Sequence, residues 1–305
     1  MKHVCIFGLG DDIGEHITQV QNNTHFHLIG IYDNNTLIAN KIANKYGIKC
    51  FTHPMDAIGQ SDIVDFANSH ILDIENAKLA IKCNKDLLLA SRFLKNMSSV
   101  QELININSEA GVDVFISQPD FFNPIIKEAL DYTSAATFVD IRRGIQTTGS
   151  ASSKEALLNL LYQEIIIATA FVNANCKRIN VVSNNMEIEK SNLINARLEF
   201  DNAAVVSINI NSIALKKYRK MDVYKSDSVV NIDVEKGEFR AMYKETNKEL
   251  YKSFEKYDYH NYIQKSFEAF DNFNDSSLRV FNLYDASKVL NILGRIEGKL
   301  ADYAM

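Results

Sequence analysis

The chain has 305 residues, of which 46% are hydrophobic and 23% charged, with 12 glycines and 3 prolines. This length suits two domains or one large one with a substantial core, and the composition excludes disordered and collagen-like chains. The formal net charge is −5, so the chain lacks the overall basic surface that generic nucleic-acid binding requires, and no nucleic-acid partner is expected.

The first part of the chain alternates between strand-like and helix-like segments. Short apolar runs typical of strands cover residues 3–7, 27–32, 63–67, 86–89 and 112–117. Helical spacing covers residues 34–46, 73–83 and 98–110. This alternation predicts a doubly wound parallel sheet with helices on both faces.

Two of the three prolines, Pro119 and Pro124, lie in the segment QPDFFNP and mark the expected boundary between a first domain, 1–122, and a second, 123–305. Beyond it, residues 154–174 predict a buried helix. Period-two stretches at 177–182, 196–200, 204–211, 220–224 and 229–233 predict an open, mixed, largely antiparallel sheet. Two helices are expected at 259–273 and 283–304, and the last is a candidate to pack back on the first domain.

A glycine-rich motif, GLGDDIG, follows the first predicted strand. Glycines at this place let the backbone turn tightly and approach a pyrophosphate at a helix N-terminus. We therefore expect a cofactor to lie against Gly8, Gly10, Asp12, Ile13 and Gly14. The alternative is a tight strand-to-helix turn with an aspartate as N-cap.

Asp33 ends the second predicted strand, about 20 residues after the glycine motif. A carboxylate at this place accepts hydrogen bonds from both ribose hydroxyls of an adenosine and repels a 2′-phosphate. The sequence therefore predicts NAD as the cofactor. The histidines are dispersed without an HxxxH or HxH pair, so no metal site is expected.

With these motifs the chain resembles the Gfo/Idh/MocA oxidoreductases, the relatives of glucose-fructose oxidoreductase and inositol dehydrogenase. The resemblance rests on GLGDDIG, on DIVDFANSH in place of the third-strand stretch of the family, and on SQPDFFNP at the end of its Rossmann domain. It implies a Rossmann domain, a second α/β domain often used for dimerisation, and a substrate beside the nicotinamide. It also places Asn68 and His70 near the cofactor.

The sequence departs from the family at the catalytic positions. The catalytic lysine of the family corresponds to Ser91 in this chain, and Arg92 follows it. The family also has an acid and a histidine on the long helix of the second domain, and these correspond to Asn159 and Gln163. Ser, Asn and Gln form hydrogen bonds with a sugar, but they do not serve as a general base near neutral pH. The candidate catalytic set is thus Ser91, Arg92, Asn159 and Gln163.

Three residues are weighed as substitutes for the missing titratable groups. Arg92 suits the stabilisation of an oxyanion or the binding of a phosphate. Tyr162 would be a proton donor or a substrate contact, although a tyrosine on an apolar helix is usually part of the core. Glu164 follows Gln163 directly, points about 100° away on a helix, and is more often a paired structural acid.

The segment LKKYRKMDVYKSD gathers basic residues in an acidic chain. It resembles the nucleotide-sugar branch of the family, notably UDP-N-acetylglucosamine 3-dehydrogenase, and predicts that Lys216 and Arg219 cradle a nucleotide diphosphate. The alternative is a strand edge protected by charge. Arg142 and Arg143 are adjacent in a predicted strand, so their side chains point to opposite faces.

The sequence therefore predicts an NAD-dependent oxidoreductase for a sugar or nucleotide sugar, with a Ser/Asn/Gln set in place of Lys/Asp/His. The alternative is a catalytically silent homologue that binds a nucleotide or sugar as a sensor or partner subunit. Scattered cysteines without a CxxC pair, and no window of about 18 apolar residues, indicate a cytoplasmic protein with no membrane contact. An exposed sheet face in the second domain makes a homodimer the expected assembly.

Overall fold

The computed structural model describes residues 1–68, 71–90, 94, 96–134, 136–146, 153–185, 191–272 and 281–302. The chain forms two compact units. The first comprises Met1–Phe122 and Asp258–Ser287, and the second comprises Asn123–Tyr257 and Lys288–Met305.

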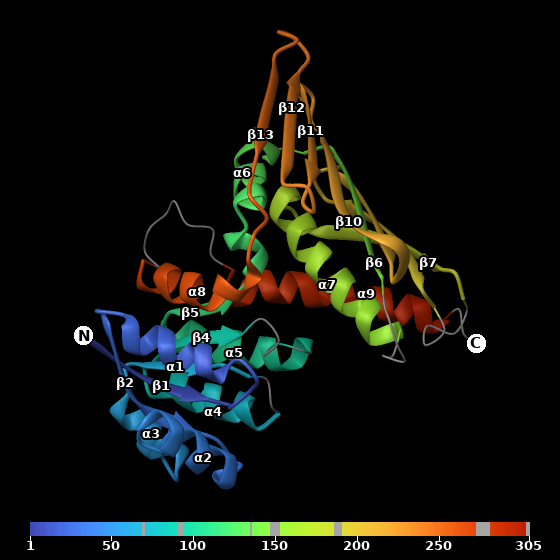
Figure 1. The fold of residues 1–305 in the computed structure, drawn as a ribbon. Helices are drawn as coiled ribbons and strands as arrows, with labels where there is room; N and C mark the ends of the chain where they lie inside the picture. Colours follow the sequence, from blue (N-terminus) through green and yellow to red (C-terminus); the bar gives the residue numbers. More distant parts are fainter. Residues whose placement is uncertain are drawn as a thin grey trace. The chain divides into compact units, whose positions relative to one another are not determined.

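The first unit is built on a five-stranded parallel sheet (Figure 1). Its strands are β1 (Lys2–Phe7), β2 (Phe26–Tyr32), β3 (Ile63–Phe66), β4 (Asp86–Ala90) and β5 (Val114–Ser117). They lie in the order β2-β1-β3-β4-β5. The order reverses between β1 and β3, and ligands of such sheets bind outside the carboxyl ends of the strands at this switch point.

Helices and short 3-10 turns surround this sheet. They are α1 (Ile13–Asn22), α2 (Thr36–Tyr46), α3 (Pro54–Gln60), α4 (Ile71–Lys82), α5 (Met97–Ala110), η2 (Pro119–Phe122), η4 (Tyr259–Asn261) and α8 (Tyr262–Asp271). Local sequence sets several of their ends. The side chain of Asn96 caps α5 by accepting from the amide of Ser99, and Gly111 ends α5 in a left-handed conformation.

Helix α8 returns to the first unit from late in the chain. Its buried residues include Ile263, Phe267 and Phe270, at helical spacing. The Phe267 ring contacts that of Phe26 at 5.7 Å between centroids, and the Phe270 ring contacts that of Phe115 at 6.1 Å. Helix α8 thus completes the core on the side of the sheet that α1 also covers.

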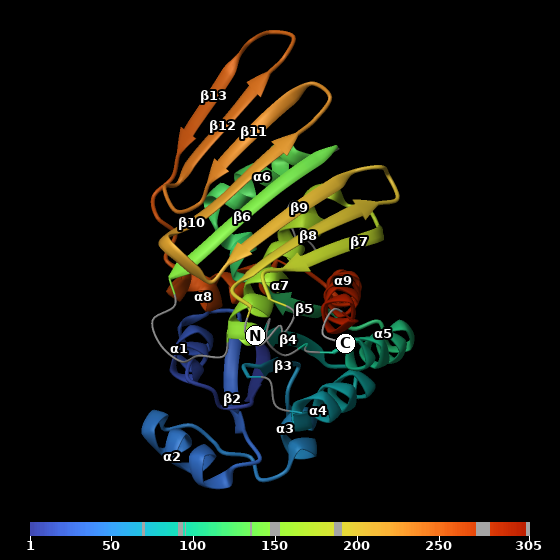
Figure 2. The same cartoon turned by 90° about the vertical axis from the view of Figure 1, so that its right-hand side faces the viewer.

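The second unit is built on an eight-stranded mixed sheet (Figure 2). Its strands are β6 (Phe138–Gln146), β7 (Cys176–Ser183), β8 (Leu193–Phe200), β9 (Val205–Asn211), β10 (Ile213–Tyr224), β11 (Ser228–Asp233), β12 (Glu238–Tyr243) and β13 (Glu249–Ser253). They lie in the order β13-β12-β11-β10-β6-β9-β8-β7, with only the β6–β9 pair parallel among these named strands.

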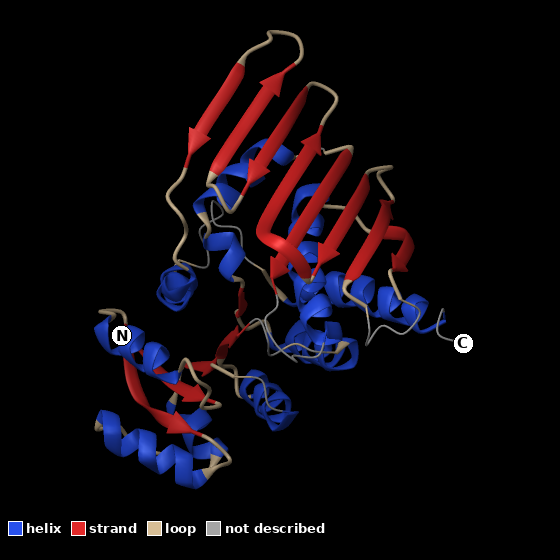
Figure 3. Ribbon diagram, turned by 45° about the vertical axis from the view of Figure 1, so that its right-hand side comes forward, coloured by secondary structure: helices blue, strands red, loops and turns tan. Residues whose placement is uncertain are grey.

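Two helices pack on one face of this sheet, α6 (Pro124–Thr133) against β11 and β12, and α7 (Ser153–Val172) against β6, β8 and β9 (Figure 3). Pro124 occupies the first turn of α6, where proline is favoured, and Asn123 caps the helix by accepting from the amide of Ile125. Helix α9 (Leu283–Asp302) begins in the first unit and continues into the second, where Arg295 donates to the Cys176 and Lys177 carbonyls.

The opposite face of the sheet carries a ladder of polar side chains. Arg142 pairs with Asp140 and Asp222, and Asn231 donates to Asp222 at 2.7 Å. The ladder continues from β6 to the neighbouring strand β9, where Asn209 donates to Asp140 at 3.4 Å. These side chains satisfy one another, so the centre of this face is polar, whereas Tyr224, Met242 and Tyr251 are exposed elsewhere on it.

The predicted fold class is confirmed: a Rossmann-like parallel sheet and a second, largely antiparallel mixed sheet, each with helices. The sequence placed the whole of residues 123–305 in one domain, whereas residues Asp258–Ser287 belong to the first unit. The reason is the apolar face of α8, which is buried against the first sheet. Within the described part of the chain, no helix is long and apolar enough to cross a membrane.

Candidate functional site

The glycine loop begins where β1 ends. Gly8 has a φ of 77°, a conformation that side chains disfavour, and its amide donates to the Tyr32 carbonyl at 3.2 Å. Gly10 lies against Asn68, because a Cβ on Gly10 would come within 2.9 Å of the Asn68 Nδ2 atom. Since Gly10 follows β1 and Asn68 follows β3, this close approach lies at the switch point of the sheet.

Helix α1 begins directly after this loop. Ile13 is its first residue and is buried, and Asp12 precedes it without capping the helix through its side chain. Asp12 instead accepts from the Tyr262 hydroxyl of α8 at 3.4 Å. In the first turn of α1, the Ile13 amide donates to the Gly10 carbonyl and the Glu15 and His16 amides donate to the Asp12 carbonyl, so these three amides already have backbone partners.

Gly14, in the first turn of α1, lies against the side chain of Tyr46 at the end of α2. A Cβ on Gly14 would lie 2.5 Å from the Tyr46 hydroxyl oxygen. The final glycine of the motif is therefore explained by close packing between two helices. Sequence analysis did not identify Tyr46 as a contact of the loop. It lies outside the glycine motif, at the end of α2, and no motif marks it.

Asp33 follows β2 and is fixed beside the loop by two backbone amides. Its Oδ2 accepts from Leu9 at 2.9 Å, and its Oδ1 accepts from Asn35 at 2.7 Å. Each carboxylate oxygen retains a further lone pair for a ligand hydroxyl. The glycine loop and the acid, which are 24 residues apart in sequence, are thus joined in one structure.

A buried ion pair lies behind the loop, within the first unit. His16 Nδ1 is 2.6 Å from Asp65 Oδ2, and the side chains are 6% and 0% exposed. Burial by itself favours the neutral imidazole, but the negative charge of Asp65 and the hydrogen bond to it outweigh burial and raise the pKa of His16. This pair joins α1 to β3, and its signal in the sequence is no more than a lone histidine on an apolar helix face.

In the second unit, the helix face of the sheet carries a buried polar cluster of four residues: Arg143, Gln163, Glu164 and Arg219. Glu164 of α7 is fully buried, and its Oε1 lies 2.7 Å from Arg143 Nη1 and 2.9 Å from Arg219 Nε. Arg143 Nη1 also donates to Gln163 Oε1 at 2.6 Å. Glu164 is therefore held by two guanidinium groups, as a structural acid is.

The other candidates of the second unit differ in their surroundings. Arg219 has a side chain only 3% exposed and faces Glu164, whereas Lys216 is exposed. Lys216 lies in a bulge of β10, since the pairing with β6 jumps between Ile213 and Tyr218. The structure therefore does not bring Lys216 and Arg219 together on one exposed surface. Asn159 of α7 is exposed, and Tyr162 is partly buried.

Three of the predicted site residues, Ser91, Arg92 and His70, lie outside the described residues. Among the remainder, the first unit brings together Gly8, Gly10, Asp12, Ile13, Gly14, Asp33 and Asn68. Within the described ranges, no group of three or more His, Cys, Asp or Glu side chains could hold a metal ion.

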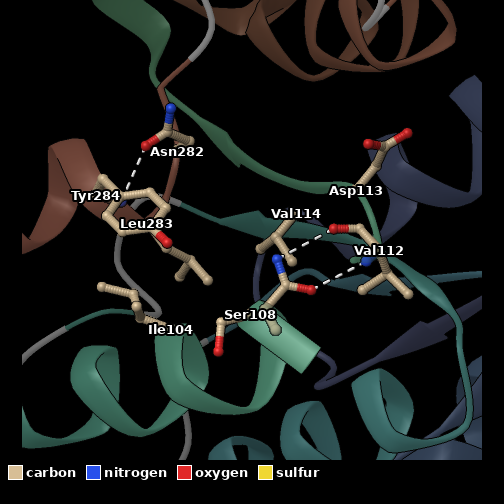
Figure 4. A pocket seen from close by; sticks show the side chains of 9 residues that line it. Ile104, Ser108, Val112, Asp113, Val114, Asn282, Leu283 and Tyr284 are labelled. Carbon is tan, nitrogen blue, oxygen red and sulfur yellow. Dashed lines mark hydrogen bonds between the residues drawn. The ribbon is translucent and has the colours of Figure 1, made fainter. Parts of the chain in front are cut away.

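A cavity of about 180 Å³ lies in the first unit, away from the glycine loop (Figure 4). Its lining includes Asp113 and Val114, at the amino end of β5, together with Asn282 and Tyr284. The Asn107 amide is already used, because it exchanges two hydrogen bonds of 3.1 Å with the Val112 backbone. Ligands of this kind of sheet bind at the carboxyl ends of the strands, so the cavity is not a candidate cofactor site.

Solved structures of similar fold cover essentially the whole chain. UDP-N-acetylglucosamine 3-dehydrogenase GnnA from Acidithiobacillus ferrooxidans is 14% identical with a TM-score of 0.83, over 100% of this chain and 99% of that chain. GenD2 from gentamicin A biosynthesis, solved with NAD, is 15% identical with a TM-score of 0.75, over 99% and 94%. Biliverdin reductase from Synechocystis sp. PCC 6803, solved with biliverdin and NADP+, is 14% identical with a TM-score of 0.70, over 99% of each chain.

The comparison of the sequence with family models finds no match, and neither does the comparison with curated proteins. The likeness thus lies in structure, and at this level of identity it shows the fold. The structural neighbours include dehydrogenases of the Gfo/Idh/MocA type, as the glycine loop and the SQPDFFNP segment predicted. The chain therefore has the fold of the Gfo/Idh/MocA-type dehydrogenases.

Proposed function

We propose that the protein is an NAD(H)-dependent oxidoreductase that acts on a sugar or nucleotide sugar. The observation that carries the proposal is Asp33, whose carboxylate is fixed by the Leu9 and Asn35 amides beside the glycine loop. The residues fit the cofactor, since Gly8 turns the loop in a conformation that side chains disfavour, and the Asp33 carboxylate beside the loop keeps a lone pair on each oxygen for the ribose hydroxyls. Structural neighbours solved with NAD and NADP+ support it.

NADH would supply the hydride in a reduction, NAD would accept it in an oxidation, and the protein has to bind and orient the reactants. Within the proposal, Asp33 accepts from the ribose hydroxyls and disfavours a 2′-phosphate, so NAD is preferred over NADP. Ser91, Asn159 and Gln163 hydrogen-bond the substrate, and Arg92 stabilises negative charge on its oxygen. Because Glu164 is engaged by Arg143 and Arg219, no general base comes from it, and reduction of a carbonyl suits these residues better than oxidation of an alcohol.

The experiment is a thermal-shift titration of the full chain with NAD, NADH, NADP and UDP-N-acetylglucosamine, singly and in pairs. NAD or NADH at 100 times its dissociation constant should stabilise the protein by about 2.7 kcal/mol. Asp33→Ala should remove this shift, and the matched control Asp56→Ala, which changes an exposed acid on α3, should retain it. Nicotinamide absorbance then reports turnover of candidate sugars.

The second candidate is a catalytically silent protein that binds a nucleotide or sugar as a sensor or partner subunit. It is favoured by the amide side chains at Asn159 and Gln163, where the resemblance implies an acid and a histidine. A shift with UDP-N-acetylglucosamine and none with any dinucleotide would select this candidate and exclude the redox one.

The assembly and the compartment are part of the same proposal. We propose a homodimer through the face of the eight-stranded sheet opposite α6 and α7, where the exposed apolar side chains of Tyr224, Met242 and Tyr251 offer a surface to a second copy. Light scattering on the purified chain measures the mass directly. The four cysteines are free, which supports a cytoplasmic location.

A further inference from the structure

Arg143 has more hydrogen-bond donors than protein acceptors. A guanidinium group carries five N–H donors, two of them on each terminal nitrogen. Both donors of Nη1 are used, one by Gln163 Oε1 at 2.6 Å and one by Glu164 Oε1 at 2.7 Å. The three donors on Nη2 and Nε meet no protein acceptor among the described residues.

Other basic residues lie close to Arg143. Arg143 and Arg219 share the single carboxylate of Glu164, which is fully buried. The neighbouring bulge of β10 adds Lys216 and Lys217, of which Lys217 pairs with Glu235 at 2.9 Å. Basic residues are thus gathered around Arg143 in a chain whose net charge is −5.

Gln163 adds a second donor to the same place. Its carbonyl oxygen faces Arg143 Nη1, because the amide nitrogen would be repelled there, and its NH2 group is therefore the group left for a ligand. No described residue accepts from this NH2 group. Arg143 and Gln163 together offer only donors, and donors without an acceptor select a ligand that carries negative charge.

Arg143 is also reachable. Its side chain is 14% exposed, against 3% for Arg219 and 0% for Glu164, so a ligand meets Arg143 first and in a place largely shielded from water. A guanidinium binds carboxylate or phosphate oxygens through two parallel N–H···O bonds, and Nη2 with Nε presents such an edge. Shielding from water strengthens these bonds.

We propose that Arg143, assisted by Gln163, forms an anion-binding site in the second unit that takes a carboxylate or phosphate group of a small molecule. Identification of that molecule as the substrate rests on the proposed function and would make the substrate an acidic or phosphorylated sugar. The adjacent Arg142 is excluded from this role, since it lies on the opposite face and pairs with Asp140 and Asp222.

The test uses the full chain without NAD, at constant ionic strength, with three probes: glucuronate, glucose 6-phosphate and neutral glucose. At least one of the two anions should bind in calorimetric titration at least tenfold more tightly than glucose, and their ranking tells a carboxylate from a phosphate ligand. Arg143→Gln should weaken anion binding about tenfold or more, because charge-assisted hydrogen bonds are lost. Arg142→Gln, the same change on the other face, should bind as the parent chain does.

Equal binding of glucose and both anions, or no binding of either anion, would overturn the proposal, as would unchanged affinity in Arg143→Gln. If Arg143→Gln does not fold, the affinity for the two anions is measured instead in Arg143→Lys and in Gln163→Leu. Each should weaken anion binding, and parent-like affinity in both would count against the site. If the anions bind but NAD and NADH give no thermal shift, the anion site stands and the proposed oxidoreductase function is excluded. If NAD or NADH gives a shift but neither anion binds, the proposed function stands and the anion site is excluded.

Discussion

His16 of α1 and Asp65 of β3 form an ion pair inside the first unit, with 2.6 Å between Nδ1 and Oδ2. The Phe267 ring and the imidazole of His16 form a T-shaped pair, with 6.2 Å between centroids. Asp12, just before α1, and Glu15, in its first turn, add negative charge that also raises the pKa of His16. Burial raises the pKa of the neighbouring Cys5 thiol, so this cysteine stays neutral.

This pair should make stability depend on pH. The folded-state pKa of His16 is raised above its unfolded value of about 6.5, so its contribution is fully present below pH ~6.5 and is lost as pH rises through the folded pKa. In Asp65→Asn, the burial that lowers the pKa of His16 remains while the largest opposing charge is removed, so the sign of the dependence should reverse. Urea unfolding from pH 5.5 to about 9 measures how the free energy of unfolding of each chain depends on pH.

The matched control for this pH series is His27→Gln, which changes an exposed histidine of β2 and should retain the parent's dependence on pH. A parent-like profile in Asp65→Asn would mean that the His16 pair does not set the dependence.

Gly14 and Tyr46 should be energetically coupled. In Gly14→Ala the new Cβ would lie 2.5 Å from the Tyr46 hydroxyl, so the ring has to shift. We expect this variant to be less stable and Tyr46→Ala to relieve the clash, with a coupling energy of about 0.5 to 3 kcal/mol in a double-mutant cycle. Strictly additive free energies of unfolding would contradict the contact.

Removal of Glu164 should destabilise the second unit strongly. Glu164→Gln leaves Arg143 and Arg219 without their shared carboxylate, and breaking a buried ion pair costs roughly 3 to 5 kcal/mol. Chemical unfolding measures this loss. Glu199→Gln, which removes a partly exposed acid 4.0 Å from Arg197, is the control and should change stability by about 0.5 kcal/mol or less. Equal effects of the two changes would contradict the ion-pair assignment.

Phe267 should be among the most sensitive positions of the first unit. It is 1% exposed and contacts Phe26 and His16. Phe267→Ala should cost about 3 to 5 kcal/mol, through lost burial and the cavity that it leaves. Phe267→Leu should cost less, because most of the volume remains. A small effect of the alanine variant on unfolding would show that α8 contributes little to this core.

Local sequence signals predicted much of the fold. Apolar runs placed β1 to β5 to within a few residues, and spacing placed α7, because both patterns depend on neighbours in sequence. Asp33 was found by its distance from the glycine loop, which follows from the geometry of a strand, turn and helix. No strand was assigned at β12 or β13, whose segments EFRAMY and ELYKS mix charged and apolar residues.

Contacts between distant segments could not be predicted. The pairing of Glu164 with Arg143 and Arg219 joins a helix to two strands, so the sequence could say only that Glu164 points away from Gln163. The alternation of side chains along a strand did place Arg142 and Arg143 on opposite faces of the sheet. This alternation is the one signal that could have identified Arg143 as the arginine that faces α7. Periodicity predicted α8 but could not say which sheet it would cover, since apolar faces are not specific for one partner.

The position of α8 has a consequence for synthesis of the protein. The ribosome makes the chain from its N-terminus, and the first domain to emerge generally folds first. Here the sheet of the first unit emerges long before Phe267 and Phe270, so the apolar surface that α8 covers stays exposed while the whole second sheet is translated. Folding of the first unit on the ribosome is therefore completed only after the second sheet and α8 have been translated, and chaperones have an apolar surface to bind until then.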